Sequence, residues 1–285
     1  MPPFDASLLH AGWCTHPEFS VMRGGRFAAR QFPAMVAVLR HPQHGLLLVD
    51  TGYAPRFHEL TRRLPWAIYA WLTPVVITPA ATAAAALRAA GVDPAEVRTI
   101  VVTHFHADHI GGLKDFPAAR FIWLEEAYAA VKTLRPLAAL CAGFLAGLLP
   151  DNFEARSSPI APQRLAPLAE LDFLFSGVDV FGDGALTLVA LPGHAAGQAG
   201  VLFTDLAGRR VFLIVDAVWL KRSLDENRPP HPLARLLMHD ASAFRQTFEK
   251  LRRLQVSHPE ITLVVTHCEE SQRALPQFGA VAPER

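Results

Sequence analysis

A dense group of metal-binding residue types follows one strand-like segment, and it constrains the fold of this chain more than any other feature. Residues 103–112 read Thr-His-Phe-His-Ala-Asp-His-Ile-Gly-Gly, which brings together His104, His106, Asp108 and His109. The run at 99–102 just before them is typical of a buried strand. Imidazoles and carboxylates are ligands that zinc prefers, and without a cation four of them would be desolvated and unsatisfied. We therefore expect the end of a strand to present these side chains to a divalent metal ion.

Composition favours one globular domain that acts on a small molecule. Hydrophobic residues make up 51% of the 285 residues, which is enough to fill a core without disulfides, so we expect a single domain over residues 1–285. The 27 basic and 26 acidic residues leave a net charge of +1, and no long run of like charges marks a surface for nucleic acid. A small-molecule substrate is the expected partner.

Cysteine usage and the first residues indicate a reducing compartment. Cys14, Cys141 and Cys268 are odd in number, widely separated and without C-x-x-C spacing, which argues against a disulfide framework or a structural zinc knuckle. Residues 1–10 have neither the basic start nor the apolar run of a signal peptide. The expected location is the cytoplasm.

Two apolar segments stand out from the rest of the chain. Residues 66–87 carry no charge, but Pro74 and Pro79 divide them into short pieces, so we expect no membrane span. Residues 136–150 are apolar throughout and too short to cross a bilayer. We treat residues 64–80 and 136–150 as apolar insertions in the domain. A lid, a wall of the substrate pocket and a subunit contact in a homodimer all remain open for them.

The remaining pattern predicts two β-rich halves with helices outside them. Residues 32–40 and 46–50 read as a hairpin that ends in Asp50-Thr51-Gly52. Helices are expected at 80–90, 125–134 and 241–255, with a short capped turn at 93–96. Further strands are expected at 120–124, 171–175, 186–191, 200–204, 211–215 and 261–266. This order favours paired sheets covered by helical layers.

Three more residues of the right type end predicted strands downstream. His194 follows the strand at 186–191, Asp216 follows 211–215, and His267 follows 261–266. With four ligand types already grouped upstream, these three are the side chains expected to complete a two-metal site.

On these residues the chain resembles the metallo-β-lactamase-fold hydrolases, through the H-x-H-x-D-H core, the early Asp50-Thr51-Gly52 and the ordered His194, Asp216 and His267. The resemblance implies an α+β fold, a four-layer αβ/βα sandwich with two divalent metal ions in a cleft at one edge of the sheets. Zinc is expected foremost, with iron or manganese as alternatives. It also implies a ligand set: His104, His106 and His194 for one metal, Asp108, His109 and His267 for the other, with Asp216 between them.

The chemistry that such a site provides is hydrolysis. Bound zinc lowers the pKa of water from about 15.7 to about 7, and two metals can hold the resulting hydroxide between them and polarise the oxygen of the attacked bond. Asp108 is placed to accept a proton and pass it to the leaving group. We expect Asp50 to orient a ligand histidine through the ring nitrogen that faces away from the metal.

Within the superfamily, residues 41–52, the Asp108-His109 pair and His267 are similar to the N-acyl homoserine lactone lactonase branch. Lactonases of that branch have a tyrosine three residues after the bridging aspartate, where this chain has Trp219, and an indole N–H donates a hydrogen bond but relays no proton. The expected reaction is opening of an ester-type bond, foremost a lactone with a hydrophobic group, with Asp108, Asp216 and Trp219 as catalytic residues.

Other functions stay open beside the lactonase hypothesis. The alternatives are a glyoxalase II-like thioesterase, a small phosphodiesterase, and a non-hydrolytic metal-binding or redox protein. Redox members of the superfamily often carry glutamate at the second histidine of the motif, so His106 favours hydrolysis. Arg222 and Arg228 lie in a polar segment where they either meet an anionic group or form a solvated loop.

Overall fold

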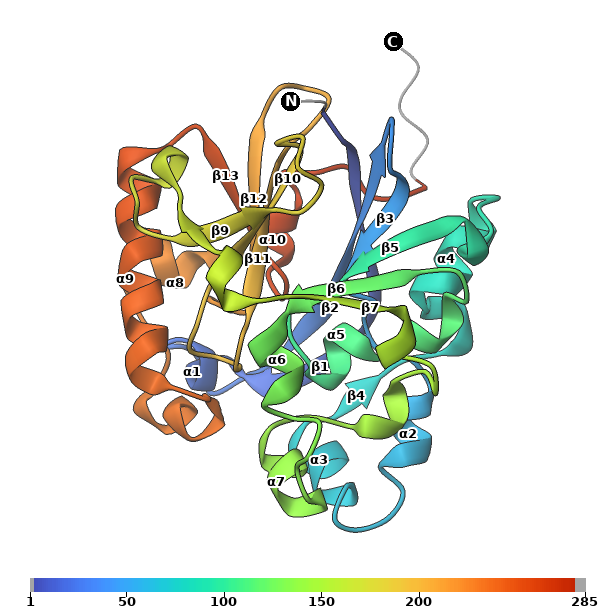
Figure 1. Ribbon diagram of the computed structural model, residues 1–285. Coiled ribbons are helices and arrows are strands. Elements are labelled where there is room, and N and C mark those ends of the chain that lie inside the picture. Colours follow the sequence, from blue (N-terminus) through green and yellow to red (C-terminus); the bar gives the residue numbers. More distant parts are fainter. Residues whose placement is uncertain (1–2, 280–285) are drawn as a thin grey trace.

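The computed structural model describes residues 3–279, without the side chains of Leu233, Leu236 and Leu237. Its centre is a pair of β-sheets that face one another, as Figure 1 shows. The first sheet has seven strands, in the order β4 (Val75–Val76), β1 (Asp5–Pro17), β2 (Ala29–His41), β3 (Gly45–Val49), β5 (Val97–Val101), β6 (Arg120–Leu124) and β7 (Ser157–Ile160). The second has six, in the order β13 (Ile261–Val265), β12 (Arg210–Val215), β11 (Ala199–Thr204), β10 (Leu186–Ala190), β9 (Ser176–Asp179) and β8 (Ala166–Pro167).

Alternating side chains on the strands create an inner and an outer core. On β2, Ala37 and Leu39 belong to the cluster packed between the sheets, whereas Val36 and Val38 belong to the cluster on the helix-covered side. On β12, Leu213 faces inward in the same way. Because successive side chains of a strand point to opposite faces, β2 contributes to both cores.

Helices cover the outer faces of both sheets. In Figure 1, α9 runs along the second sheet, and α2 and α4 lie beside the first. The α-helices are α1 (Glu18–Val21), α2 (Arg56–Leu60), α3 (Ala67–Leu72), α4 (Ala83–Ala89), α5 (Ala107–Ile110), α6 (Glu125–Ala129), α7 (Pro136–Cys141), α8 (Lys221–Asp225), α9 (Ala241–Ser257) and α10 (Glu269–Gln272). Short 3₁₀ turns span Pro79–Ala81, Pro94–Glu96, Leu113–Asp115, Ala146–Leu148, Glu154–Arg156, Pro162–Arg164, Ala169–Leu171 and Pro232–Leu237. The expected α+β sandwich of four layers is confirmed.

Parallel pairing explains why the polar strand ends meet. Strand β3 pairs in parallel with β5, and β12 pairs in parallel with β13. Since parallel neighbours end at the same edge of a sheet, the residues that follow β3 and β5 share one edge, and those that follow β12 and β13 share another.

The predicted strand at 171–175 is wrong. Leu171 ends a 3₁₀ turn, and Asp172 and Phe173 have φ angles of 52° and 56°, which no extended strand contains. The strand begins only at Ser176. The helix expected at 125–134 ends earlier, at Ala129. Strand β1, which pairs with β2 along most of its length, was not predicted.

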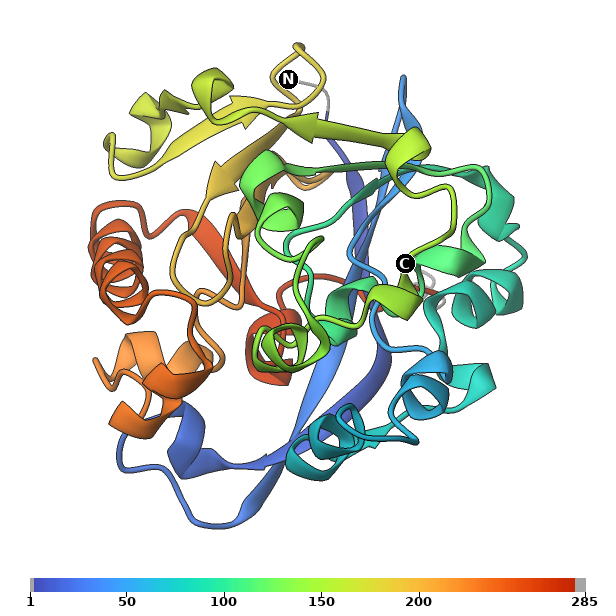
Figure 2. The same ribbon diagram turned by 60° about the horizontal axis from the view of Figure 1, so that its bottom comes forward.

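The two apolar segments are partly buried and partly exposed. They carry α3 and α7, on the side at the bottom of Figure 1, which Figure 2 brings forward. Phe144 and Leu148 are buried, whereas Leu64, Trp71 and Leu137 are 75%, 78% and 67% exposed. The segment at 136–150 is therefore not one continuous helix: it is α-helical over Pro136–Cys141, turns at Gly143, where φ is 62°, and ends in the 3₁₀ turn Ala146–Leu148.

Two further findings concern the length of the helices and the state of the cysteines. Within residues 3–279, every helix is too short or too polar to cross a bilayer. Cys14, Cys141 and Cys268 are all free thiols.

Candidate metal centre

Seven side chains from the two sheets come together in two adjacent groups. His104 and His106 lie in the loop after β5, and Asp108 and His109 lie on α5. The second sheet contributes three residues from loops after its strands: His194 after β10, Asp216 after β12 and His267 after β13. The ligand atoms of His104, His106 and His194 lie within 4.8 Å of one another, as do those of Asp108, His109, Asp216 and His267. The family resemblance implied the same division of the five histidines and Asp108, and Asp216, which it assigned to both metals, lies with the second group.

The first group consists of three imidazoles that face a common point. Nε2 of His194 is 2.9 Å from Nδ1 of His106. The rings of His104 and His106 stand edge to face, with centroids 4.5 Å apart. Burial lowers the pKa of His104 well below its ordinary value and that of His194 to about 3. Both rings are therefore neutral and keep a lone pair for a cation.

The second group combines two carboxylates with two imidazoles. Nε2 of His267 lies 3.2 Å from Oδ2 of Asp108 and 3.1 Å from Oδ2 of Asp216. Burial alone would raise the pKa of both carboxyl groups, but the rings of His109 and His267 hold each pKa well below its usual range. Conversely, burial lowers the pKa of His267, and the two carboxylates outweigh it and raise that pKa to about 10.

Asp216 joins the two groups. Its Oδ2 lies 3.4 Å from Nε2 of His194 in the first group and 3.1 Å from Nε2 of His267 in the second. One carboxylate thus reaches both sets of ligand atoms, which is the position expected of a residue shared by two cations.

The unsatisfied atoms of the site fit divalent metal ions. Among the described residues, Nε2 of His104, Nε2 of His109 and Oδ1 of Asp216 are buried without a hydrogen-bond partner. Such atoms are costly to bury unless something binds them, and all three belong to the groups that face a common point. A set of imidazole nitrogens and carboxylate oxygens suits zinc, iron or manganese.

Two hydrogen bonds from behind fix the orientation of the ligand rings. Nδ1 of His109 is 2.7 Å from Oδ2 of Asp50, and Nδ1 of His267 is 2.8 Å from the carbonyl oxygen of Pro33. Because a carboxylate and a carbonyl only accept, each Nδ1 donates, which leaves Nε2 of each ring facing the site as the nitrogen that a cation would bind in place of a proton. The expectation that Asp50 orients a histidine of the motif is confirmed.

Asp50 is itself held in place by Thr103. The backbone N–H of Thr103 donates to Oδ1 of Asp50 at 2.9 Å, and the Thr103 hydroxyl donates to Oδ2 at 2.8 Å. The Asp50 residue is only 2% exposed and has a φ of 61°. A strained turn at the end of β3 therefore positions the carboxylate behind His109.

Trp219 lies against the first group, as its place in the sequence suggested. Its indole stands edge to face with the ring of His194, with centroids 5.4 Å apart, and is tilted against Phe244 at 5.9 Å. The side of His194 next to Trp219 is thus closed by an aromatic wall.

Both apolar segments touch the metal-binding motif. A Cβ on Gly143 would lie 2.8 Å from Cδ2 of His106, so the backbone of residues 136–150 passes directly over that ring. Tyr69, on α3, bonds with the backbone of Ala107, and burial raises the pKa of its phenol. Sequence reasoning missed Tyr69, because nothing near it in the chain indicated contact with α5.

A third group of metal-ligand types, His41, His44 and Asp183, does not fit a metal ion. Nδ1 of the buried His41 accepts the backbone N–H groups of Gln43 and His44 at 3.1 and 3.0 Å. A neutral imidazole that accepts at Nδ1 carries its proton at Nε2, which leaves no lone pair on the atom that faces Asp183. This group connects the β2–β3 hairpin to the β9–β10 loop.

Comparisons with known proteins agree with this geometry. A sequence model of the metallo-beta-lactamase superfamily matches residues 29–257. A protein named N-acyl homoserine lactonase AttM, from Azorhizobium caulinodans, is 28% identical over 223 residues, which are 75% of this chain and 75% of that protein. A probable metallo-hydrolase of Mycobacterium tuberculosis is 29% identical over 231 residues, covering 78% of this chain and 71% of the relative.

Solved structures share the fold over nearly the whole chain. An N-acyl homoserine lactone hydrolase with N-hexanoyl-L-homoserine bound at its catalytic metal centre aligns with a TM-score of 0.73 at 18% identity, covering 98% of this chain and 99% of that one. AidC, a dizinc quorum-quenching lactonase, aligns with a TM-score of 0.63 at 13% identity, covering 95% and 90%.

Proposed function

Because this chain belongs to the metallo-β-lactamase superfamily, we propose that it is a dinuclear metal-dependent hydrolase that opens a lactone carrying a hydrophobic group. The observation that carries the proposal is the convergence of His194, Asp216 and His267, from the second sheet, on the motif that follows β5. Its curated relatives include proteins named as lactonases and metallo-hydrolases, which supports hydrolysis as the reaction class.

Seven residues would hold the two cations: His104, His106 and His194 one of them, Asp108, His109 and His267 the other, and Asp216 both. When bound, such ions acidify a water molecule and polarise the oxygen of the attacked bond. The protein supplies the fixed arrangement of ligand atoms, because Asp50 and the Pro33 carbonyl orient the rings of His109 and His267.

Asp108 is the residue proposed to move the proton. Its Oδ2 lies 3.2 Å from Nε2 of His267 and 3.4 Å from Nε2 of His109, so the carboxylate is held at the centre of the second group. In its ionised form it accepts a proton at this oxygen and returns it to the leaving alcohol. Trp219, beside His194, excludes water from that side and offers an indole N–H to the substrate.

The apolar segments support a substrate with a hydrophobic group. Residues 136–150 reach His106 through Gly143, and α3 reaches Ala107 through Tyr69, so apolar chain borders the site on two sides. Phe144, which packs near Phe105, is part of this border. An apolar wall next to a carbonyl-activating centre favours an acyl chain over a polar or polymeric substrate.

A substrate panel on the metal-loaded protein tests the proposal. We expect γ-decalactone to be opened with a higher kcat/KM than γ-butyrolactone, by about tenfold for the added apolar chain, and both to be opened faster than a thioester or a phosphodiester. His106→Ala is the inactive control. Preference for the thioester would favour a glyoxalase II-like thioesterase, and preference for the phosphodiester would favour a small phosphodiesterase. No turnover of any member by protein with two bound metals would refute hydrolysis.

A further inference from the structure

A pocket lies on the far side of the aromatic wall that borders His194. It has a volume of about 420 Å³ and is formed by the turn after α1, residues 229–238 and the first turns of α9. Phe244 belongs to both places, because it lines the pocket and its ring is tilted against Trp219. Backbone bonds from His239 to the His194 carbonyl and from Asp240 to the Gly193 carbonyl fasten this wall to the metal centre.

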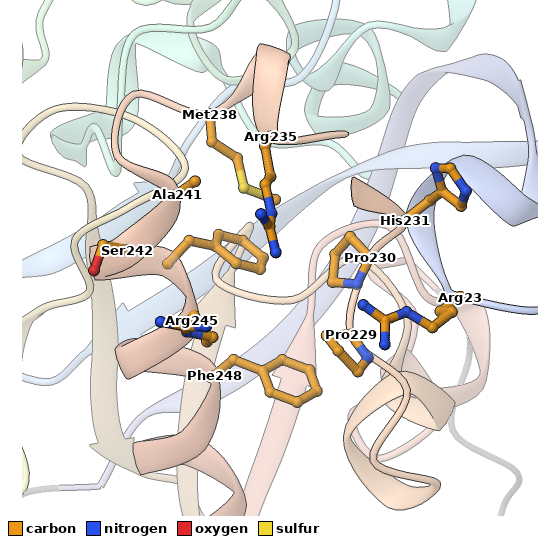
Figure 3. A pocket seen from close by; sticks show the side chains of 11 residues that line it. Arg23, Pro229, Pro230, His231, Arg235, Met238, Ala241, Ser242, Arg245 and Phe248 are labelled. Carbon is orange, nitrogen blue, oxygen red and sulfur yellow. The ribbon is translucent and has the colours of Figure 1, made fainter. Parts of the chain in front are cut away.

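Three arginines line the pocket: Arg23, Arg235 and Arg245. In Figure 3 the side chain of Arg235 extends down from above and that of Arg23 extends in from the right, with Pro230 between them in this view and Arg245 on the left. Of the described residues that line this pocket, none is acidic. The chain as a whole has a net charge of only +1, so this local excess of positive charge is a feature of the pocket rather than of the composition.

The carboxylates of the neighbouring segments are engaged elsewhere. Glu18 pairs with Arg30 and Arg222, and Glu226 pairs with Arg222 and Arg228. The sequence left open whether Arg222 and Arg228 meet an anionic group or form a solvated loop, and in the structure both pair with glutamate side chains of this chain. Asp240 caps α9 by accepting from the backbone N–H groups of Ser242 and Ala243.

Among the described residues, no ion pair is formed by the three arginines of the pocket. Arg23 is nevertheless fixed at its backbone. Its N–H donates to the Pro229 carbonyl at 2.9 Å, and its own carbonyl accepts from Nε of Arg228 at 2.9 Å. Because all three arginine residues are exposed, their positive charges remain available to an anion that enters the pocket.

The rest of the lining is apolar. Phe248 and Met238 face the pocket together with Phe244 and the prolines 229 and 230. We propose that this pocket binds an organic carboxylate with an apolar body, the guanidinium groups of Arg23 and Arg235 holding the carboxylate and the rings of Phe244 and Phe248 contacting the body. Guanidinium groups match a carboxylate in geometry and charge, and the aromatic rings remove the attached chain from water.

A carboxylate is also what hydrolysis of an ester produces. Water and R–CO–O–R′ give R–COO⁻, H⁺ and R′–OH, so the product of the proposed reaction has the chemistry of this pocket. The binding proposal does not require that reaction, because it is tested by binding alone.

Calorimetric titration of the purified, metal-loaded protein at low salt provides the test. The probes are octanoate, octanamide, acetate and octyl phosphate. We expect octanoate to bind about tenfold or more tightly than octanamide, which lacks the charge, and than acetate, which lacks the chain. Arg235→Gln and Arg23→Gln should each weaken octanoate binding about tenfold. Arg253→Gln is the matched control, because Arg253 is exposed on the same α9 and lies outside the pocket, and it should leave binding unchanged.

Two further arms separate this pocket from the metals and from other anions. His106→Ala should keep octanoate binding, and loss in that variant with retention in Arg235→Gln would assign the ligand to the metal centre and overturn the proposal. If octanamide bound as tightly as octanoate, or if Arg253→Gln weakened octanoate binding as much as Arg235→Gln, the arginines of the pocket would not be the groups that bind the carboxylate, and the proposal would be overturned. Binding of octyl phosphate without binding of octanoate would overturn the carboxylate assignment.

Discussion

Replacing Asp50 by asparagine changes one atom behind the candidate metal centre and isolates the role of that carboxylate. Oδ2 of Asp50 accepts from Nδ1 of His109 at 2.7 Å, while Oδ1 accepts from the backbone of Thr103 at 2.9 Å. In Asp50→Asn the amide oxygen keeps the Thr103 bond, so the amide NH2 faces His109. An NH2 group only donates, and Nδ1 of His109 must then accept.

That exchange moves the proton of His109 to Nε2. This atom faces the carboxylates of Asp108 and Asp216 at 3.4 and 3.5 Å, and with a proton on it the ring cannot coordinate a cation. Loss of such a supporting partner typically costs about 10- to 100-fold in metal affinity, or about 1.4 to 2.7 kcal/mol. We expect the second metal to be lost first, with a fall in the free energy of unfolding of about 1 to 3 kcal/mol for the altered buried bonds.

The assay is the metal content per chain after dialysis against competing chelators of graded affinity, together with thermal unfolding. Asp205→Asn is the matched control. Asp205 is also buried and accepts backbone N–H groups, from Ala207 at 3.0 Å and Arg209 at 2.9 Å, but it lies outside both metal groups. It should lose stability and keep both metals. If Asp50→Asn retains both metals with wild-type affinity, the tautomer argument is refuted.

Three further perturbations have defined outcomes. His106→Ala should reduce hydrolysis by at least about 100-fold while circular dichroism shows a folded chain, and unchanged turnover would contradict the ligand role. Gly143→Ala introduces a Cβ 2.8 Å from the His106 ring at a φ of +62° and should lower both activity and stability. Gly91→Ala is the control: its φ is +77° and the space around it is open, so it should lower stability alone. If both variants lost the same activity, contact between residue 143 and the His106 ring would not be the cause. Glu18→Gln tests pH dependence. The Arg26 backbone N–H and the nearby arginines hold the pKa of Glu18 below its ordinary 4.5, against the effect of burial. The ionised Glu18 therefore stabilises the fold above pH 4.5, and this contribution is lost as the pH falls through the lowered pKa. The difference in melting temperature between wild type and Glu18→Gln should shrink as the pH falls from 7 to 3. A difference that stays constant over this range would exclude the effect.

The metal-binding motif was predictable because its ligands follow strands in a regular way. His104, His194, Asp216 and His267 each stand just after an apolar run, and a parallel or neighbouring strand end brings such residues to one edge. The helix at 241–255 follows from hydrophobic periodicity, which buries Phe244, Phe248 and Leu251 on one face of α9.

Other features depend on contacts that periodicity does not encode. Asp172 and Phe173 adopt left-handed backbone conformations in an apolar stretch that reads as a strand. Tyr69 reaches Ala107 across a long separation in sequence. The arginines at 23, 235 and 245 line one pocket because the turn after α1 is bonded to the segment before α9. Such sites become visible only when the tertiary arrangement is known.

Metal content and turnover measured on the same preparation test the central claim most directly. The seven side chains should bind two divalent ions per chain, and lactone hydrolysis should disappear on removal of the ions and return in proportion to their replacement. Full hydrolytic activity in protein with less than one bound ion per chain would contradict the account.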